Sequence, residues 1–409
     1  MTEDTNKKEL ECSFCSKSRS EVEKLVAGPS VYICNECIDL SHKILHDNYA
    51  DSEDNTNEYI DPKEIKEFLD QYVISQDHAK KTLCVAAYNH YRRANNPVID
   101  GVDIEKSNVL LLGPSGSGKT LLIKTLAKKL GVPMAIADAT TLTEAGYVGE
   151  DAESVLERLI QSANGNIELA EKGIVFIDEI DKKARRSESN TSTRDVSGEG
   201  VQQALLRLIE GTNTFVTVGG QGIRGDKIEF DTSSVLFILG GAFVGLEEII
   251  SKRVNKRTNI GFKSSRDEKK VKNLFNYVQP EDIINFGLIP ELVGRIPVLS
   301  ALEDLEKDDL ITILKDSKNS VINQIKALYK LENISVGFTD NFYNIVATMA
   351  VEQKTGARGL RNILEDFFLD LTFNIADLKK DKVIEIYINN LDKESVKFIH
   401  EKEVDNEEK

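Results

Sequence analysis

The chain has 409 residues, and at about 100 to 200 residues per domain this length predicts two to four domains with enough material for a sizeable core. Its 52 basic and 68 acidic side chains give a net charge of −16, which disfavours chain-wide attraction to nucleic acid or anionic lipid. The longest uncharged apolar stretch, Val235 to Leu246, is shorter than the about 20 residues of a membrane span, and the N-terminus lacks a secretion signal. We therefore expect a cytoplasmic protein with neither a membrane nor a nucleic-acid partner.

Four of the five cysteines form two pairs, Cys12-x2-Cys15 and Cys34-x2-Cys37. This doubled spacing is typical of a zinc ribbon, in which two tight turns supply the tetrahedral sulfur shell that Zn²⁺ prefers. Because four sulfurs close that shell, the zinc should be structural. A redox pair or buried thiols are the alternatives. The fifth cysteine, Cys84, lies in an apolar helical stretch and is predicted to be a core residue.

The predicted organisation is an N-terminal zinc-binding domain over residues 1–45 and an acidic linker over residues 46–61, which has too few aliphatic side chains to fold. Helical patterns over Lys63 to Leu69 and Gln76 to Arg93 begin a large domain at residues 62–300. Four short apolar runs in that domain predict buried strands of a parallel sheet covered on both faces. The runs are Asn108 to Leu112, Met134 to Asp138, Ile174 to Asp178 and Val235 to Leu239.

A smaller, mainly helical domain is predicted over residues 301–398, followed by a charged tail over residues 399–409. Its expected helices cover Asp304 to Tyr329, Asp340 to Val351 and Ala357 to Leu378. Alternating apolar residues predict one strand over Val383 to Ile388.

The segment Gly113 to Thr120 fits the pattern G-x-x-x-x-G-K-[ST] and follows a predicted strand directly. In this pattern the glycines let backbone N–H groups surround phosphate oxygens, Lys119 reaches the β and γ phosphates, and the Thr120 hydroxyl binds Mg²⁺. A glycine turn before a helix is the plainer alternative. The expected nucleotide contacts in this segment are Gly113, Pro114, Ser115, Gly116, Ser117, Gly118, Lys119, Thr120 and Leu121.

A second predicted strand ends in Asp178, Glu179 and Asp181. Asp178 is placed to bind Mg²⁺, directly or through water, and Glu179 to orient and deprotonate an attacking water. Helix capping is the alternative, which is reasonable for Asp181 and weak for the other two. The two motifs together predict an ATPase without saying what work it performs.

Taken with the four cysteines, further segments make the chain resemble the ClpX family of AAA+ unfoldases, which feed substrates to the ClpP peptidase. These segments are Gly113 to Thr120, Asp138 to Gly149, Arg194 to Ala204, Gly294-Arg295 and Gly356 to Gly359. The resemblance covers essentially the whole chain from Cys12 onwards. It implies an α/β AAA+ P-loop fold, a homohexameric ring with ATP and Mg²⁺ between subunits, and protein substrates delivered with or without adaptors.

The resemblance also implies roles for single residues. Tyr147 and Val148 match the pore loop that grips the translocating polypeptide, although a tyrosine in a glycine turn is more often a packing residue. Arg295 corresponds to the arginine finger that reaches a neighbouring subunit's γ phosphate, and Arg358 to the sensor arginine of the small domain. For a lone arginine, a surface ion pair would be the default.

Val73 and Ile74 match the family's adenine-contacting segment, but Ser75 stands where the family usually has glycine, which puts the local turn in question. A second departure lies before the strand at Val235, where the family carries Arg-Lys-His at the pore entrance. Here the loop from Ile223 to Lys227 contains Arg224 and Lys227, and Asp226 partly cancels their charge. Recognition of an anionic C-terminus is therefore expected to be weaker or altered.

Ile260, Gly261 and Phe262 lie inside a basic stretch, Ser251 to Asn273, which carries nine Lys or Arg residues. An apolar tripeptide in a polar loop costs solvation unless it docks, and it matches the family's ClpP-binding loop. A disordered basic loop that touches nucleic acid is the alternative.

The expected function is ATP-driven unfolding of proteins and their transfer to ClpP. A zinc-ribbon remodeller of nucleic acid and a peptidase-independent chaperone remain the two other possibilities.

Overall fold

The computed structural model describes residues 11–29, 31–46, 61–143, 149–185, 198–218, 226–258 and 274–400. The chain divides into two compact units, Met1–Tyr59 and Ile60–Lys409. The first unit contains a two-stranded antiparallel sheet, β1 (Leu25–Ala27) with β2 (Tyr32–Cys34), and the helix α1 (Asn35–His46). Among the described helices, none combines the length and apolar character that crossing a membrane requires.

The second unit is built on a five-stranded parallel sheet, ordered β13-β5-β12-β9-β6. Its strands are β5 (Val109–Leu112), β6 (Met134–Asp138), β9 (Ile174–Asp178), β12 (Leu236–Gly241) and β13 (Val298–Ala301). The prediction of a parallel sheet from four buried apolar runs is confirmed, while β13 is an edge strand that the sequence did not reveal.

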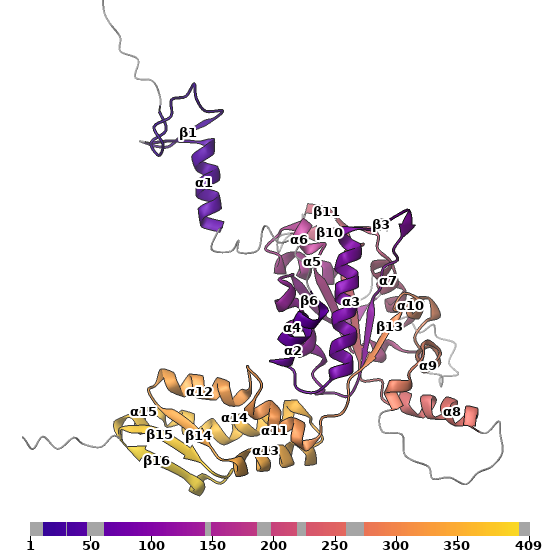
Figure 1. The fold of residues 1–409 in the computed structure, drawn as a ribbon, viewed down its shortest axis with the longest axis vertical. Helices are drawn as coiled ribbons and strands as arrows, with labels where there is room; N and C mark the ends of the chain where they lie inside the picture. Colours follow the sequence, from indigo (N-terminus) through magenta and orange to yellow (C-terminus); the bar gives the residue numbers. More distant parts are fainter. Residues whose placement is uncertain are drawn as a thin grey trace, which may run out of the picture. The chain divides into compact units, whose positions relative to one another are not determined.

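Each central strand sends alternate side chains into one of two cores, as a sheet covered on both faces requires. On β5, Val109 and Leu111 pack towards α2 (Pro62–Asp70), α3 (Asp77–Asn95) and α4 (Lys119–Leu130). Leu110 and Leu112 pack on the other face towards α5 (Ser154–Ser162) and α7 (Glu199–Glu210). Figure 1 shows α2, α3 and α4 together beside the sheet in indigo and purple. Cys84 of α3 is buried in this core as predicted, and burial raises the pKa of its thiol to about 12.

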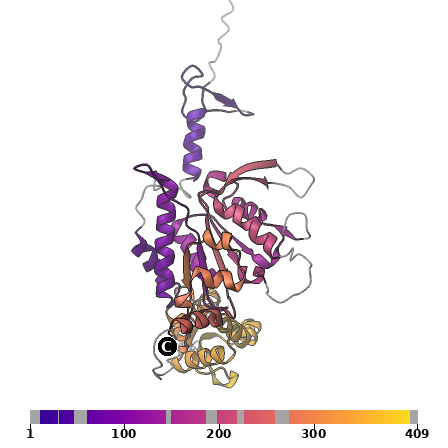
Figure 2. The same ribbon diagram turned by 90° about the vertical axis from the view of Figure 1, so that its right-hand side faces the viewer.

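Shorter elements complete the large domain. They are β3 (Val98–Ile99), β4 (Val102–Asp103), η1 (Ala139–Thr141), β7 (Leu142–Thr143), β8 (Glu150–Asp151), α6 (Ile167–Ala170), η2 (Ile180–Lys183), β10 (Asn213–Val218), β11 (Asp226–Asp231), α8 (Leu246–Thr258), η3 (Leu274–Tyr277), α9 (Pro280–Phe286) and α10 (Pro290–Gly294). The antiparallel pair β10 and β11 forms a hairpin, drawn in pink, which projects from the sheet in Figure 2.

The C-terminal region has a core of its own, formed by helices and a three-stranded sheet ordered β14-β15-β16. Its elements are α11 (Lys307–Lys315), α12 (Val321–Leu331), β14 (Ser335–Phe338), α13 (Asp340–Glu352), α14 (Ala357–Phe373), α15 (Ile375–Lys380), β15 (Val383–Ile388), η4 (Lys393–Ser395) and β16 (Val396–His400).

Two of the predicted helices in this region are wrong in extent. The helix expected over Asp304 to Tyr329 is broken after Lys315, because Ser320 caps a new helix by accepting a 3.1 Å hydrogen bond from the Asn323 N–H. The helix expected over Ala357 to Leu378 is divided at Asn374.

The charged tail also begins later than predicted. Ile399 and His400 belong to β16, where Ile399 pairs with Glu385 of β15. The strand extends to His400 because pairing with β15 provides hydrogen-bond partners for its backbone N–H and C=O groups, even though the sequence after it is highly charged.

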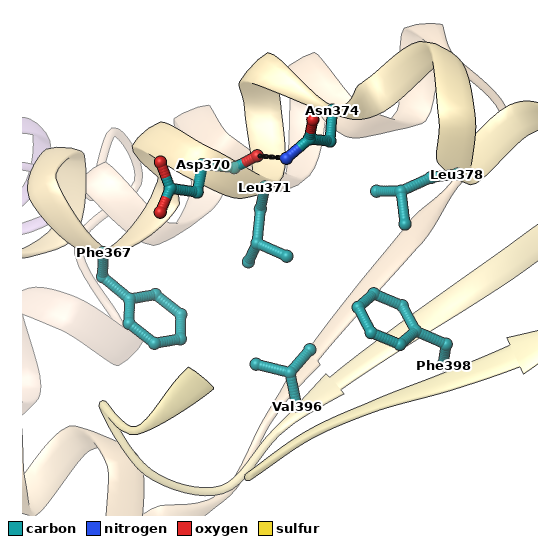
Figure 3. Close-up of a pocket in the computed structure, with 7 residues that line it drawn as sticks. All are labelled: Phe367, Asp370, Leu371, Asn374, Leu378, Val396 and Phe398. Carbon is teal, nitrogen blue, oxygen red and sulfur yellow. Dashed lines mark hydrogen bonds between the residues drawn. The ribbon is translucent and has the colours of Figure 1, made fainter. Parts of the chain in front are cut away.

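A cavity of about 270 Å³ lies between α14, α15 and β16 (Figure 3). Phe367, Leu371, Leu378, Val396 and Phe398 make its wall apolar, with Asp370 and Asn374 also lining it. The Asn374 amide donates a 3.0 Å hydrogen bond to the Asp370 carbonyl and so stays within its own helix end. Such a lining does not provide the cationic and N–H donors that a nucleotide phosphate needs.

Candidate functional site

The loop from Gly113 to Gly118 joins the end of β5 to the start of α4. Gly113, Gly116 and Gly118 have φ of 149°, 81° and 100°, in the region that favours glycine. A Cβ at Gly113 would lie 2.8 Å from the Leu302 carbonyl oxygen, and one at Gly116 would lie 2.7 Å from that of Thr355. Gly113 and Gly116 are therefore required both by the backbone conformation and by the close approach of Leu302 and Thr355, whereas Gly118 is required by the conformation alone.

The ammonium of Lys119 lies inside this loop. It donates hydrogen bonds of 2.7 Å to the Gly113 carbonyl and 3.1 Å to the Pro114 carbonyl. Burial lowers the pKa of Lys119 from its ordinary value, while the carboxylate of Asp178 acts in the opposite direction. A buried cation surrounded by backbone groups at a helix start fits a nucleotide phosphate.

The start of α4 and the end of β9 bring Thr120 and Asp178 together. The Thr120 hydroxyl donates a 3.3 Å hydrogen bond to Asp178 Oδ2, although the two residues come from different motifs. A hydroxyl and a carboxylate side by side form the oxygen donor set that Mg²⁺ accepts in phosphoryl-transfer sites.

Glu179 follows Asp178 and has a left-handed backbone, with φ of 59°. Its own N–H donates a 2.9 Å hydrogen bond to Asp178 Oδ1, and its side chain is exposed. This unusual conformation turns the chain sharply at the end of β9. As a result, Asp178 is half-buried while Glu179 is exposed.

Asp181 does not cap a helix through its side chain, so the capping alternative is wrong for it. Its carboxylate is buried and accepts a 3.2 Å hydrogen bond from the Ala242 N–H beyond β12. It therefore joins the ends of β9 and β12, next to the expected magnesium site.

The predicted adenine segment lies between α2 and α3. Val73 is buried in the core beneath α4, and its carbonyl accepts a 3.1 Å hydrogen bond from the buried Lys80 ammonium. Ser75 has φ of 56°, which is the conformation that glycine adopts most easily. The turn is thus present despite the serine, and the side chain of Ser75 bonds to Asp309.

The two predicted arginines occupy different places. Arg358, in the first turn of α14, donates a 3.2 Å hydrogen bond to the Ser115 hydroxyl and so contacts the phosphate-binding loop of its own chain. Arg295 follows α10, forms a 3.1 Å ion pair with Glu210 and keeps 56% of its side chain exposed. The structure therefore brings Arg358 to the expected phosphate-binding loop, Gly113 to Gly118, and leaves more than half of the Arg295 side chain exposed.

The four predicted zinc ligands are brought together in the first unit. Their sulfur atoms all lie within 4.8 Å of one another, with Cys15 and Cys34 3.6 Å apart and Cys12 and Cys37 3.9 Å apart. All five cysteines are free thiols. The Cys34 N–H donates to Cys12 Sγ at 3.3 Å, and the Cys37 N–H donates to Cys34 Sγ at 3.4 Å. A shell of four sulfurs, held by backbone donors, fits a structural Zn²⁺ ion.

Several predicted residues lie outside the described ranges: Tyr147, Val148, Ile260, Gly261 and Phe262, together with Ile223 to Gly225. The pore-loop segment is flanked by the parallel pair β7 and β8. At Gly149 a Cβ would lie 2.6 Å from the Thr143 hydroxyl, so only glycine allows β8 to begin where it does.

Sequence reasoning missed two buried amides near the site. Asn108 precedes β5 and donates to the Arg295 carbonyl at 2.8 Å, and Gln76 contacts both Ser117 and Glu303. Their position in the sequence could have indicated them, because Asn108 directly precedes the strand before the glycine-rich motif and Gln76 directly follows the predicted adenine segment and Ser75.

Three parts of the chain match known families. Residues 10–47 match the ClpX C4-type zinc finger, residues 104–299 match the AAA domain (Cdc48 subfamily), and residues 305–373 match the C-terminal, D2-small domain, of ClpB protein. A curated relative from Treponema denticola, named "ATP-dependent Clp protease ATP-binding subunit ClpX", is 49% identical over 405 residues. The match covers 96% of this chain and 97% of the relative.

Proposed function

The chain belongs to the ClpX family, and from this membership we propose that it unfolds protein substrates at the expense of ATP and delivers them to the ClpP peptidase. As an AAA+ protein of this family it is an ATPase that uses ATP with Mg²⁺ and binds Zn²⁺. The observation that carries the proposal is the convergence of Lys119, Thr120 and Asp178 at one edge of the sheet, within a chain related to ClpX over nearly its full length.

In the proposed site, Mg²⁺ supplies charge neutralisation for the phosphates. The loop from Gly113 to Gly118 offers backbone N–H groups, and Lys119 places its ammonium at the β and γ phosphates. Thr120 and Asp178 would hold the cation, and Leu121 follows Thr120 within the first turn of α4. Glu179 takes the proton of the attacking water, because its exposed carboxylate lies at the open end of β9.

Two arginines complete the site in this proposal. Arg358 senses the nucleotide of its own subunit, supported by its contact with Ser115. Arg295 acts on the nucleotide of a neighbouring subunit in a homohexameric ring, supported by its exposed side chain. An arginine supplied in trans stabilises the charge of the transition state and makes hydrolysis depend on assembly.

Work on the substrate is assigned to residues outside the described ranges. Tyr147 and Val148 grip the polypeptide, because an aromatic ring offers a large surface to any side chain. Ile260, Gly261 and Phe262 dock in apolar pockets of ClpP. A cytoplasmic location is part of the proposal, since the four cysteines must stay reduced to bind zinc and do so in a reducing compartment.

The test is loss of fluorescence from a stably folded fluorescent protein with an unstructured C-terminal tag, in the presence of ClpP and ATP. We expect loss that needs hydrolysis, and we expect the Tyr147→Ala chain to hydrolyse ATP while unfolding poorly. A non-hydrolysable ATP analogue is the control for hydrolysis.

Persistent fluorescence with two unrelated tags, while ATP is hydrolysed, would contradict the proposal. ATP hydrolysis stimulated by DNA with a steep salt dependence would instead indicate a remodeller of nucleic acid. Normal ClpP binding by a Phe262→Ala chain would remove the docking role from that loop.

A further inference from the structure

Ser75 and Gln76 are consecutive residues with left-handed backbones, with φ of 56° and 60°. Left-handed conformations are unfavourable for residues with a Cβ, and two in succession persist only where surrounding contacts hold them. Both residues stand between the adenine segment, Val73 and Ile74, and the start of α3 at Asp77. The strained pair is therefore adjacent to the proposed nucleotide site.

Gln76 is 5% exposed, and its side chain connects two separate segments. Its Oε1 accepts a 2.8 Å hydrogen bond from the Glu303 N–H, and its Nε2 donates to the Glu303 carbonyl at 2.9 Å. The same Nε2 donates to the Ser117 carbonyl at 3.4 Å. One buried amide thus joins the phosphate-binding loop to the segment that leads from β13 to α11.

Ser75 makes the next connection. Its hydroxyl donates to Oδ1 of Asp309, while Oδ2 of Asp309 accepts a 2.9 Å hydrogen bond from the Glu306 N–H. Glu306 and Asp309 form the capping box at the start of α11. The serine that replaces the expected glycine is therefore attached to the first turn of the small domain's first helix.

The residues just before Ser75 contact the same part of the small domain. The Ser317 hydroxyl donates to the Tyr72 carbonyl at 2.9 Å, and the Lys318 N–H donates to the Gln71 carbonyl at 2.8 Å. Hydrogen bonds thus connect this short segment to both ends of α11. A displacement of the segment would move α11 with it, because these contacts hold both of its ends.

We propose that Ser75 and Gln76 are positioning residues that couple nucleotide binding to the placement of the small domain. The proposal rests on the proposed nucleotide site. A bound nucleotide would fix the positions of Val73, Ile74 and the phosphate-binding loop. The Gln76 amide then holds Glu303 in place, and the Ser75 hydroxyl holds the first turn of α11 in place. The Ser75 contact is an addition of this chain, since glycine at that position has no side chain to donate.

Hydrogen exchange of the full chain, with and without ADP and Mg²⁺, tests the coupling at two places. Amides of α4 report nucleotide binding, and amides of residues 310–313, beginning with the Leu310 N–H that donates to the Glu306 carbonyl, report the start of α11. In the wild type we expect ADP to slow exchange at both places, by about tenfold or more at α11 if the coupling is worth one charge-assisted hydrogen bond.

Substitutions then separate the two contacts. In Ser75→Gly, which suits the left-handed backbone, the slowing at α11 should fall to about twofold or less while α4 stays protected and the thermal midpoint stays near the wild type. Ser75→Ala should behave the same way at α11, which assigns the effect to the hydroxyl. Gln76→Met, which keeps the length but removes the amide, should abolish the slowing. Asn276→Ala, which removes a 3.4 Å bond to the Glu303 side chain and leaves the Glu303 backbone contacts in place, is the matched control.

The outcomes are distinguishable. Protection of α4 without any change at α11 in the wild type overturns the coupling and leaves the nucleotide site standing. Full ADP-dependent slowing at α11 in Ser75→Gly and Gln76→Met also overturns it. If ADP protects neither place, the nucleotide site itself is wrong and the coupling falls with it.

Discussion

The side-chain amide of Asn108 donates a 2.8 Å hydrogen bond to the main-chain carbonyl of Arg295. The same amide donates to the Ile209 carbonyl at 3.4 Å, and Asn108 is 1% exposed. Asn108 immediately precedes the strand that leads to the phosphate-binding loop. The backbone of the proposed arginine finger is thereby fixed to the strand that leads to the proposed nucleotide site of its own chain.

Replacement of Asn108 by alanine should therefore reduce both stability and ATP turnover. One buried carbonyl and one partly buried carbonyl lose their donor, which costs about 1 to 3 kcal/mol of unfolding free energy, and Arg295 loses its anchor. Turnover at a temperature well below the thermal midpoint, compared with wild type, measures the second effect separately. Asn213→Ala, which removes an exposed 3.0 Å bond to Glu229, is the control. Full turnover in folded Asn108→Ala would show that the anchor does not position Arg295.

The Glu179→Gln chain should bind ATP and fail to turn it over. Glutamine keeps the size of the side chain but cannot accept the proton of the attacking water, and loss of a general base lowers rates by about 10² to 10⁴. Nucleotide binding and phosphate release measure the two steps. Glu168→Gln, an exposed carboxylate on α6, should behave as wild type. Turnover near the wild-type rate in Glu179→Gln would assign the base to another residue.

His90 should make the protein lose stability on acidification between about pH 6.5 and 4. Burial, assisted by the charges of Lys106 and Arg93, lowers the pKa of the folded-state imidazole to about 4, although its bond to the Ser234 carbonyl opposes the shift. In this window the imidazole is protonated in the unfolded chain but neutral in the folded chain. The free energy of unfolding therefore rises with pH, by at most about 1.4 kcal/mol per pH unit.

The comparison for this prediction is His90→Gln, which can keep a donor to Ser234 but has no proton to gain. Denaturant unfolding at several pH values should show a shallower slope for His90→Gln than for wild type. Gln161→Ala, which alters an exposed and non-titrating residue of α5, should keep the wild-type slope. Equal slopes in all three chains would mean that His90 titrates alike in the folded and unfolded states.

Replacement of Cys15 by serine should release the zinc and unfold the first unit alone. The described residues of that unit bury few side chains besides Cys12 and Cys34, so its folding depends on the metal. Zinc content and hydrogen exchange at residues 25–34 measure the loss. The thermal midpoint of the second unit should not change, because Ile60–Lys409 is compact by itself. Cys84→Ala, a buried thiol outside the cluster, should retain zinc.

Much of the site was predictable because its motifs are contiguous. Glycine positions encode the left-handed backbone of the phosphate-binding loop, and apolar runs encode the buried strands β5, β6, β9 and β12. The edge strand β13 was missed because a run of four residues after a proline has no clear periodicity. The break between α11 and α12 was missed because Ser320 acts as a cap that an otherwise helical pattern concealed.

By itself, the sequence determined which chemical groups are present: a phosphate-binding loop, two acidic residues after a strand, four cysteines in zinc spacing, and the order of the domains. Only the tertiary structure decided which distant groups meet. Asn108 and Arg295 are 187 positions apart, and Gln76 and Glu303 are 227 apart. In each pair a side-chain amide bonds to backbone atoms of the partner. Because every residue has such backbone atoms, the partner cannot be identified from the sequence, and only the fold shows which two residues meet.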